Sequence, residues 1–191
     1  MRCDDYEIFL VDIYVFLSKK NDFFLFYYVI LYNKIMAIKR LMNEYQQYIK
    51  DPNPYYSIVP SEEDIFTWDV LLFGSSETIF EGAIFKCQFK FNNEYPNKPP
   101  EFKFISSFPH PNIYTDGKVC ISILHEGKDQ FNYEHISERW NPSHSVNSIL
   151  MSILTIISTP NFESPANIDA SIMWRNNWFE YKKIIYNFIT N

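Results

Sequence analysis

The sequence predicts an α+β fold in which one small antiparallel sheet is covered by helices. Two observations carry this prediction: apolar and polar residues alternate in a run of short segments, and apolar residues three or four positions apart mark helices before and after them. Because the predicted strands follow one another over short connections, we expect a four-stranded antiparallel meander. The 191 residues are long enough for one such domain and one appendage.

The first helix is predicted where the helical spacing becomes regular, from Met36 onward. Its apolar residues are Ile38, Leu41, Met42, Tyr45 and Ile49. Lys39 and Arg40 fall between them, so we expect these two cations on the solvated face of an amphipathic helix. Residues 51–54, with two prolines, end the helix.

Four segments are predicted as the strands, and they are residues 58–60, 66–73, 83–91 and 102–104. The third alternates most clearly, because Phe85, Cys87 and Phe89 face one way while lysine and glutamine face the other. Cys87 is therefore expected in the core. The proline-rich segment 93–100 cannot be a helix interior or a central strand, so it is predicted to be a rigid, exposed loop.

The second half of the chain is predicted to be mainly helical. An apolar helix covers residues 146–157, capped by Ser143 or Ser145. Because its apolar residues occupy more than one face, we expect it to be the central buried helix. A short helix over residues 170–176 and a final helix from Trp178 complete the predicted fold.

The composition excludes some classes of partner and site. The net charge is −6, so no polybasic surface argues for nucleic acid or anionic lipid, and a protein partner is favoured. Cys3, Cys87 and Cys120 stand far apart without Cys-x-x-Cys or Cys/His spacing, which argues against a metal site or a disulfide framework. Free thiols fit a reducing compartment, and we expect a cytoplasmic protein.

The first 35 residues differ from the rest. Two apolar and aromatic runs, residues 8–17 and 23–32, are each too short to span a bilayer as a helix. The acidic start also lacks the basic region of a signal peptide. Three interpretations stand open: a weak membrane-associating anchor, an extra packed helix, or residues translated upstream of the true start. We favour the third, because Met36 and its successors form a natural beginning.

One stretch, residues 110–120, has neither helical nor strand periodicity. It carries two turn signals, Pro111-Asn112 and Asp116-Gly117, and ends in Cys120 at the edge of an apolar run. We therefore expect a surface loop that presents a thiol. A lone cysteine of this kind is either an inert small hydrophobe or a nucleophile.

The stretch His110-Pro111-Asn112, with Cys120 eight residues after the asparagine, resembles the active-site signature of ubiquitin-conjugating enzymes. Three more motifs agree with that family in the same order along the chain. Residues 80–82 resemble its pre-strand turn, residues 94–100 its proline-rich loop and residues 140–142 its post-cysteine motif. The ordered set is far more specific than any one motif.

A finer resemblance concerns the insertion between Cys120 and Trp140 and the segment 161–170. Both are similar to the G-type subgroup, whose members have an extended acidic loop after the active-site cysteine. Some members serve endoplasmic-reticulum-associated degradation, which implies ubiquitin chains for the proteasome and recruitment to that membrane. Two departures stand out: Pro109 replaces a bulky hydrophobe before the signature, and Lys128 makes the insertion less acidic.

The resemblance implies the ubiquitin-conjugating-enzyme fold, with residues 1–35 an extension outside the mature fold and residues 36–191 the catalytic domain. The enzyme would accept ubiquitin from the ubiquitin-activating enzyme as a thioester on Cys120. It would then transfer ubiquitin to lysines of protein substrates or of ubiquitin, with a RING-type ubiquitin ligase. No cofactor is implied, since ATP is used by the activating enzyme, and membrane contact would require the N-terminal extension. The alternatives are a non-catalytic binding module and a conjugating enzyme for another ubiquitin-like modifier.

By the same resemblance, individual residues take roles in the reaction. Asn112 would donate an N–H to the developing oxyanion, hold the loop in shape, or do both. His110 and Pro111 would be structural. His125 would position or deprotonate the incoming lysine, with a solvated loop histidine as the alternative.

Further residues are implied in contacts with the substrate and with partner proteins. Glu126 and Asp129, in the acidic loop, would ease the approach of a positively charged lysine, or be loop charges only. The positions that would contact the activating enzyme or a ligase are Lys39, Arg40, Pro96, Asn97, Pro142 and Ser143.

Overall fold

The computed structural model describes residues 22–129 and 134–190. The predicted apolar run 8–17 and Cys3 lie outside the described residues. In chain order the described elements are α2 (Asp22–Lys50), β1 (Tyr56–Pro60), β2 (Thr67–Phe73), β3 (Ile84–Lys90), β4 (Glu101–Phe104), the 3₁₀ turn η1 (Ser122–Leu124), α3 (Val146–Ser158), α4 (Ile168–Asn176) and α5 (Trp178–Thr190).

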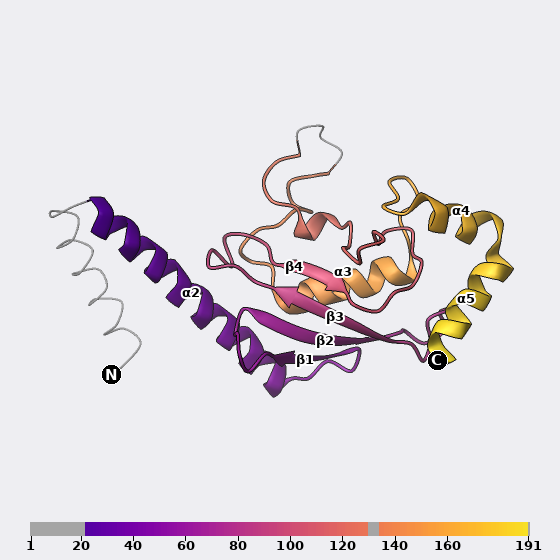
Figure 1. Ribbon diagram of the computed structural model, residues 1–191, viewed down its shortest axis with the longest axis horizontal. Helices are drawn as coiled ribbons and strands as arrows, with labels where there is room; N and C mark the ends of the chain where they lie inside the picture. The colour runs from indigo at the N-terminus through magenta and orange to yellow at the C-terminus, as the bar shows by residue number, and fades with distance from the viewer. Residues whose placement is uncertain (1–21, 130–133, 191) are drawn as a thin grey trace.

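The four strands form one antiparallel sheet in the order β1-β2-β3-β4, which confirms the predicted meander (Figure 1). The register pairs Cys87 of β3 with Val70 on one side and with Phe104 on the other. All three side chains are buried, and Cys87 is only 2% exposed. Burial raises the pKa of the Cys87 thiol well above its ordinary value. Cys87 is therefore an inert part of the core.

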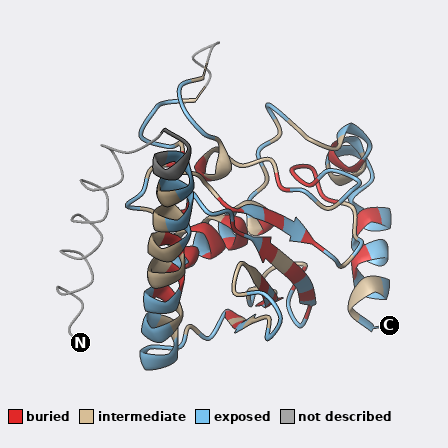
Figure 2. Ribbon diagram, turned by 60° about the vertical axis from the view of Figure 1, so that its left-hand side comes forward, coloured by how far each residue is buried: buried red, intermediate tan, exposed pale blue. Residues whose placement is uncertain are grey.

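Helix α3 shares one core with the buried face of the sheet (Figures 1 and 2). Its buried positions are Val146, Ile149, Leu150, Ile153, Leu154 and Ile157. Burying one such side chain contributes roughly 1.5–3 kcal/mol. The cap is Ser145, whose hydroxyl accepts from the Ser148 N–H while the Ser148 hydroxyl accepts from the Ser145 N–H. The predicted central helix is thus confirmed.

Helix α2 is longer than predicted, because it is already formed at Asp22 rather than near Met36. No proline or glycine interrupts this segment, so nothing in the sequence stops the helical hydrogen bonds upstream. Leu41 is fully buried, whereas Phe26 and Tyr27 are 68% and 65% exposed, and the upstream half projects away from the sheet (Figure 1). Among the described residues, no helix is both long and apolar enough to cross a bilayer. The domain boundary at residue 36 stays a prediction.

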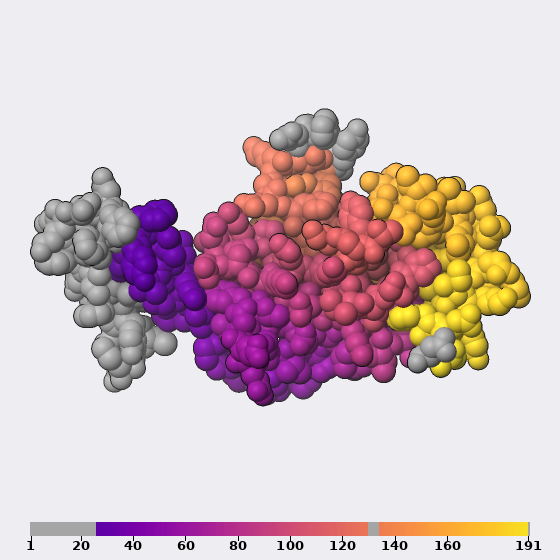
Figure 3. Space-filling model, in the orientation of Figure 1, coloured from indigo at the N-terminus to yellow at the C-terminus, as the bar shows by residue number. Residues whose placement is uncertain are grey.

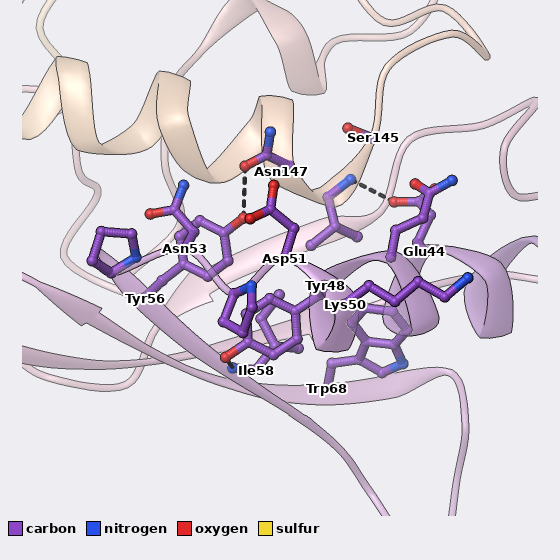
Figure 4. A pocket seen from close by; sticks show the side chains of 14 residues that line it. Glu44, Tyr48, Lys50, Asp51, Asn53, Tyr56, Ile58, Trp68, Ser145 and Asn147 are labelled. Carbon is purple, nitrogen blue, oxygen red and sulfur yellow. Dashed lines mark hydrogen bonds between the residues drawn. The ribbon is translucent and has the colours of Figure 1, made fainter.

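Glu44 is a buried carboxylate that joins α2, the proline-rich loop and α3. It accepts hydrogen bonds from the Arg40 guanidinium at 2.6 Å, from the Tyr95 hydroxyl at 2.5 Å and from the Val146 N–H at 2.6 Å. The bond to Val146, drawn in Figure 4, places negative charge at the N-terminus of α3, where the helix dipole favours it. Arg40 is therefore not on a freely solvated face, and its side chain is 29% exposed.

A hollow of 590 Å³ lies beside Glu44, between the end of α2, strand β1 and the start of α3 (Figure 4). The Tyr56 hydroxyl donates to Asn147 Oδ1 at 2.6 Å and so connects β1 to α3. The rings of Tyr48 and Trp68 line the same hollow. These contacts hold the two helices in place relative to the sheet.

Helices α4 and α5 lie at the end of the molecule opposite the projecting half of α2 (Figure 1). Helix α4 begins at Ile168, two residues before the predicted start, because Asn167 Oδ1 caps it by accepting from the Ala170 N–H at 3.0 Å. Helix α5 begins at Trp178 as predicted, and it buries Tyr181 and Ile185.

Candidate active site

The segment 110–120 folds back on itself and ends in a half-buried thiol. An antiparallel bridge pairs Ile113 with Val119, and the Cys120 N–H donates to the Asn112 carbonyl at 3.0 Å. Gly117 has a φ of +89°, and a Cβ there would lie 2.1 Å from a backbone carbonyl oxygen, so this turn requires glycine. The loop therefore presents Cys120 at the surface, unlike the buried Cys87.

His110 is fully buried and holds the start of the loop. Its Nδ1 accepts from the Asn112 N–H at 3.1 Å, which requires that Nδ1 is unprotonated, so Nε2 donates to the Ile157 carbonyl at 3.2 Å. Burial lowers the pKa of His110 to about 4, although the Ile157 carbonyl acts in the opposite direction. The ring is thus neutral near pH 7 and both of its nitrogens are occupied.

The Asn112 side chain is also buried, and its carboxamide binds the backbone of a distant loop. Its Nδ2 donates to the Asn161 carbonyl at 2.8 Å, and its Oδ1 accepts from the Asn161 N–H at 2.9 Å. This reciprocal pair ties the loop before Cys120 to the chain after α3. The carboxamide oxygen and one N–H are committed to the loop, so any donation to a substrate oxygen uses the second N–H.

The C-terminal helices also support this loop. The Tyr181 hydroxyl of α5 donates to the Pro109 carbonyl at 2.7 Å, and the Asn167 N–H donates to the Pro111 carbonyl at 2.9 Å. Because Pro109 interacts through its backbone oxygen, the departure from a bulky side chain leaves this support intact. Pro111 itself is buried.

His125 lies beside Cys120 because the turn η1 reverses the chain between them. A hydrogen bond with His125 lowers the pKa of the Cys120 thiol below its ordinary value, against the opposing effect of partial burial, and a hydrogen bond with Tyr114 also lowers it. The bond to Cys120, together with contacts to Glu134, raises the pKa of His125 to about 9 although partial burial opposes this. The two residues can therefore form a thiolate–imidazolium pair.

Glu134 is a candidate site residue that the sequence alone does not reveal. Its two oxygens lie 2.9 and 3.0 Å from His125 Nδ1, and Oε1 also accepts from the Ser122 hydroxyl at 2.8 Å. Arg139 donates to Oε2. Partial burial raises the pKa of Glu134, but the hydrogen bonds from His125 and Ser122 and the charges of His125 and Arg139 together hold it below its ordinary value. No periodicity or motif marks a glutamate fourteen positions after Cys120 in a polar loop.

Arg139 fastens the described parts of the acidic loop to one another. Besides Glu134, it binds the carbonyls of Gly127 at 2.6 Å and Glu126 at 2.8 Å. Asp129 Oδ2 accepts from the Glu134 N–H at 3.1 Å, so Asp129 has a structural contact, while the Glu126 side chain is exposed. In the space-filling view the described part of this loop projects from the top of the molecule (Figure 3).

The residues implied in partner contacts lie around one junction. Arg40 of α2 donates to the Pro142 carbonyl at 3.1 Å and to the His144 carbonyl at 2.7 Å. Trp140 Nε1 donates to the Pro96 carbonyl at 2.9 Å. These bonds join α2 to the loops that carry Asn97 and Ser143, both exposed, while Lys39 is half-buried.

Comparison with known proteins identifies the family of this chain. Residues 40–189 match the family described as ubiquitin-conjugating enzyme. The chain belongs to the ubiquitin-conjugating enzyme family. Members of this family are transferases that work through a thioester intermediate, with ubiquitin and ubiquitin ligases. The predicted family, fold and enzyme class are confirmed.

Curated relatives resemble this ubiquitin-conjugating enzyme over most of its length. "Ubiquitin-conjugating enzyme E2-18 kDa" of Schizosaccharomyces pombe is 46% identical over 155 residues, which cover 80% of this chain and 93% of the relative. "Ubiquitin-conjugating enzyme E2 G2" of Homo sapiens is 45% identical over 150 residues, covering 78% and 91%. "Probable ubiquitin-conjugating enzyme E2 7" of Caenorhabditis elegans is 50% identical over 123 residues, covering 64% and 75%. The likeness to E2 G2 confirms the G-type subgroup.

The candidate site of this ubiquitin-conjugating enzyme contains a thiol, a histidine and a carboxylate. Across residues 22–129 and 134–190, no group of three His, Cys, Asp or Glu side chains is placed to hold a metal ion. The chemistry that this arrangement supports is acyl transfer through sulfur, with the histidine available to move a proton.

Proposed function

We propose that Cys120 is the residue that carries ubiquitin. The half-exposed thiol, hydrogen-bonded to His125, is the observation on which this proposal rests. The Cys120 thiolate attacks the carbonyl carbon of the thioester on the activating enzyme. A new C–S bond forms, the old C–S bond breaks, and the activating enzyme's thiolate leaves.

In the second step, a lysine amine attacks the thioester on Cys120. The C–N bond forms, the C–S bond breaks, and the amine proton must be accepted by a base. A free lysine has a pKa of about 10.4 and is mostly protonated near pH 7. His125 lies at the sulfur and is our candidate to position the amine and accept its proton.

Asn112 keeps the loop before Cys120 in shape in this proposal, through its bonds to Asn161. The second Asn112 N–H donates to the oxyanion that develops on the thioester carbonyl. Removing a donor to such an oxyanion typically costs about 2.7–4 kcal/mol in the barrier. Glu126 and Asp129 provide negative charge near the path of the incoming lysine.

The partner surface is proposed around the junction of α2 with the two neighbouring loops. A RING-type ligase would contact α2 and the exposed positions at Asn97, Pro142 and Ser143. Lys39 and Arg40 would serve the activating enzyme, with Arg40 limited by the bonds it already makes inside the fold. ATP is consumed by the activating enzyme, and no cofactor of this chain enters the reaction.

The similarity to E2 G2 supports a role in building ubiquitin chains for proteasomal degradation. We place the enzyme in the cytoplasm, with recruitment to the endoplasmic reticulum membrane. Residues 36–191 are proposed as the catalytic domain, with residues 1–35 as an extension.

A charging assay tests the proposal. The full chain is mixed with ubiquitin, activating enzyme and ATP, and the product is separated on a non-reducing gel; parallel reactions replace ubiquitin with other ubiquitin-like modifiers. We expect a thiol-sensitive adduct with ubiquitin alone. Cys120→Ala should abolish it, and Cys87→Ala, the matched control in the core, should retain it. Charging by another modifier in place of ubiquitin would contradict the proposed substrate.

A further inference from the structure

We propose that Glu134 is a positioning residue for lysine discharge, which it controls by holding His125 Nδ1 and so directing Nε2 towards the sulfur of Cys120. The inference rests on the proposed function of Cys120 and His125 and adds a residue to it. Glu134 does not touch the thiol. It acts through the imidazole.

The carboxylate of Glu134 has the geometry that such a role requires. Both oxygens lie within 3.0 Å of His125 Nδ1, so Nδ1 carries a proton and donates it to the carboxylate. With Nδ1 occupied, Nε2 is the nitrogen left for Cys120. A carboxylate that fixes the tautomer and orientation of a catalytic imidazole is a general arrangement in acyl transfer.

Glu134 is itself held from three directions. The Ser122 hydroxyl binds Oε1, Arg139 binds Oε2, and Asp129 accepts from the Glu134 N–H. Arg139 also binds the backbone of the loop just after His125. The carboxylate is therefore placed by contacts on both sides of the acidic loop, and His125 is placed by the carboxylate.

The contribution of Glu134 is greatest when ubiquitin is attached. An acylated sulfur bears no negative charge, so it no longer stabilises the imidazolium as the free thiolate does. Glu134 then remains to support a proton on His125. As the lysine attacks, the C–N bond forms, Nε2 takes the amine proton, the C–S bond breaks and the Cys120 thiolate is released beside the new imidazolium. The same Cys120–His125 hydrogen bond lowers the pKa of the thiol and raises that of the imidazole in the free enzyme, so it supports this product state.

Several other titratable groups lie near His125 and its partner Glu134. Next to His125 are Cys120, with Tyr114 on the thiol, and Glu126, the following residue. Around Glu134 are Arg139 and Asp129. On strands β3 and β4 and on the loop that share a hollow with His125 are Lys90, Glu101, Lys103 and Lys118. In the described part of the chain, the hydrogen bonds and charge interactions that shift the pKa of His125 come from Cys120 and Glu134.

The test is single-turnover discharge of the ubiquitin-loaded enzyme to free lysine between pH 6 and pH 9. We expect Glu134→Gln to load ubiquitin within twofold of wild type but to discharge it at least tenfold more slowly at pH 8, as for loss of support to a general base. Without the carboxylate charge the pKa of the imidazole falls, so the acidic limb of the profile should move to lower pH by about one unit. Glu138→Gln, an exposed change in the same loop, is the matched control.

Arg139→Gln gives a second test, in which the pH profile of discharge should shift in the opposite direction. Removing this cation strengthens the pull of Glu134 on the His125 proton, so the acidic limb should move to higher pH. If both variants discharge more slowly with an unshifted pH profile, Glu134 only stabilises the loop and the inference is overturned. Wild-type discharge by Glu134→Gln overturns it as well. Failure of wild type to load Cys120, or no effect of His125→Gln on discharge, would instead contradict the proposed function.

Discussion

The carboxamide of Asn112 and the backbone of Asn161 form a closed pair of hydrogen bonds, 2.8 and 2.9 Å long, across 49 positions of the chain. This pair connects the loop before Cys120 to the segment that follows the central helix. Because the Cys120 N–H also binds the Asn112 carbonyl, the position of the thiol depends on the same residue.

Asn112→Ala should therefore affect both stability and chemistry. Leaving the Asn161 N–H and carbonyl without their partners should lower the free energy of unfolding by about 1–3 kcal/mol. Discharge to free lysine should fall further than loading, since the oxyanion donor is also lost. Urea denaturation and single-turnover kinetics measure the two effects.

Asn161→Ala is the matched control, because Asn161 contributes its backbone to the pair and its side chain makes only an exposed local bond from the Glu163 N–H. We expect both the free energy of unfolding and the discharge rate to stay close to wild type. An Asn112→Ala variant that is destabilised but discharges normally would assign Asn112 to loop structure alone.

Glu44 should be important for stability without taking part in the chemistry. Glu44→Ala removes the acceptor shared by Arg40, Tyr95 and the Val146 N–H, and it leaves a partly buried guanidinium without its carboxylate. We expect a loss of about 3–5 kcal/mol in the free energy of unfolding. Glu63→Ala, an exposed change, should remain within about 0.5 kcal/mol of wild type in the same urea titration.

His110 should make stability depend on pH. Burial lowers its folded pKa to about 4, whereas an unfolded histidine titrates near 6.5, so the unfolded state binds more protons in that interval. Stability from the neutral ring is complete above the unfolded pKa and is lost as pH falls towards the folded pKa. Over the whole interval between the two pKa values, the loss in the free energy of unfolding is about 3 kcal/mol.

Urea unfolding at half-unit steps from pH 7.5 to 4.5 measures this dependence. His110→Gln provides the comparison, since it keeps a polar side chain and removes the titrating group. In this window the free energy of unfolding should depend less steeply on pH in the variant. The difference in slope should correspond to close to one proton bound on unfolding. Identical slopes would show that His110 titrates normally in the fold.

Cys120 should react with iodoacetamide at lower pH than an ordinary thiol. Its hydrogen bond with His125 favours the thiolate, and His125→Gln should move the midpoint of the alkylation profile to higher pH. Cys87 is buried with a raised pKa, so it should stay unmodified in the native protein. Mass mapping of the two cysteines distinguishes them, and a profile unchanged in His125→Gln would remove His125 from the site.

The sequence predicted the parts of this fold that depend on local pattern. Alternation along residues 83–91 was enough to predict that Cys87 is buried. Apolar spacing was enough to identify α3 as the central helix. The loop before Cys120 could be predicted from its turn signals, and its relationship to a family from the ordered motifs.

The contacts made across the fold could not be predicted in this way. Glu44 looks like any polar residue of an amphipathic helix, and its burial depends on Tyr95 and Val146, which lie far away in sequence. Glu134 carries no local signal, because its role arises only when η1 turns His125 back towards Cys120. The upstream part of α2 was missed because regular apolar spacing starts at Met36, whereas a helix that is anchored by packing at its downstream end can continue upstream where no breaker occurs.

The central claim is that ubiquitin is carried on Cys120, and locating the attachment tests it most directly. Cys120→Ser should convert the labile thioester into a stable ester, which can be digested with trypsin and mapped by mass spectrometry. We predict the diglycine remnant of ubiquitin at position 120, with hydroxylamine sensitivity, and a thiol-sensitive adduct of one ubiquitin on wild type. A remnant elsewhere in the chain, or an adduct that survives in Cys120→Ala, would contradict the account.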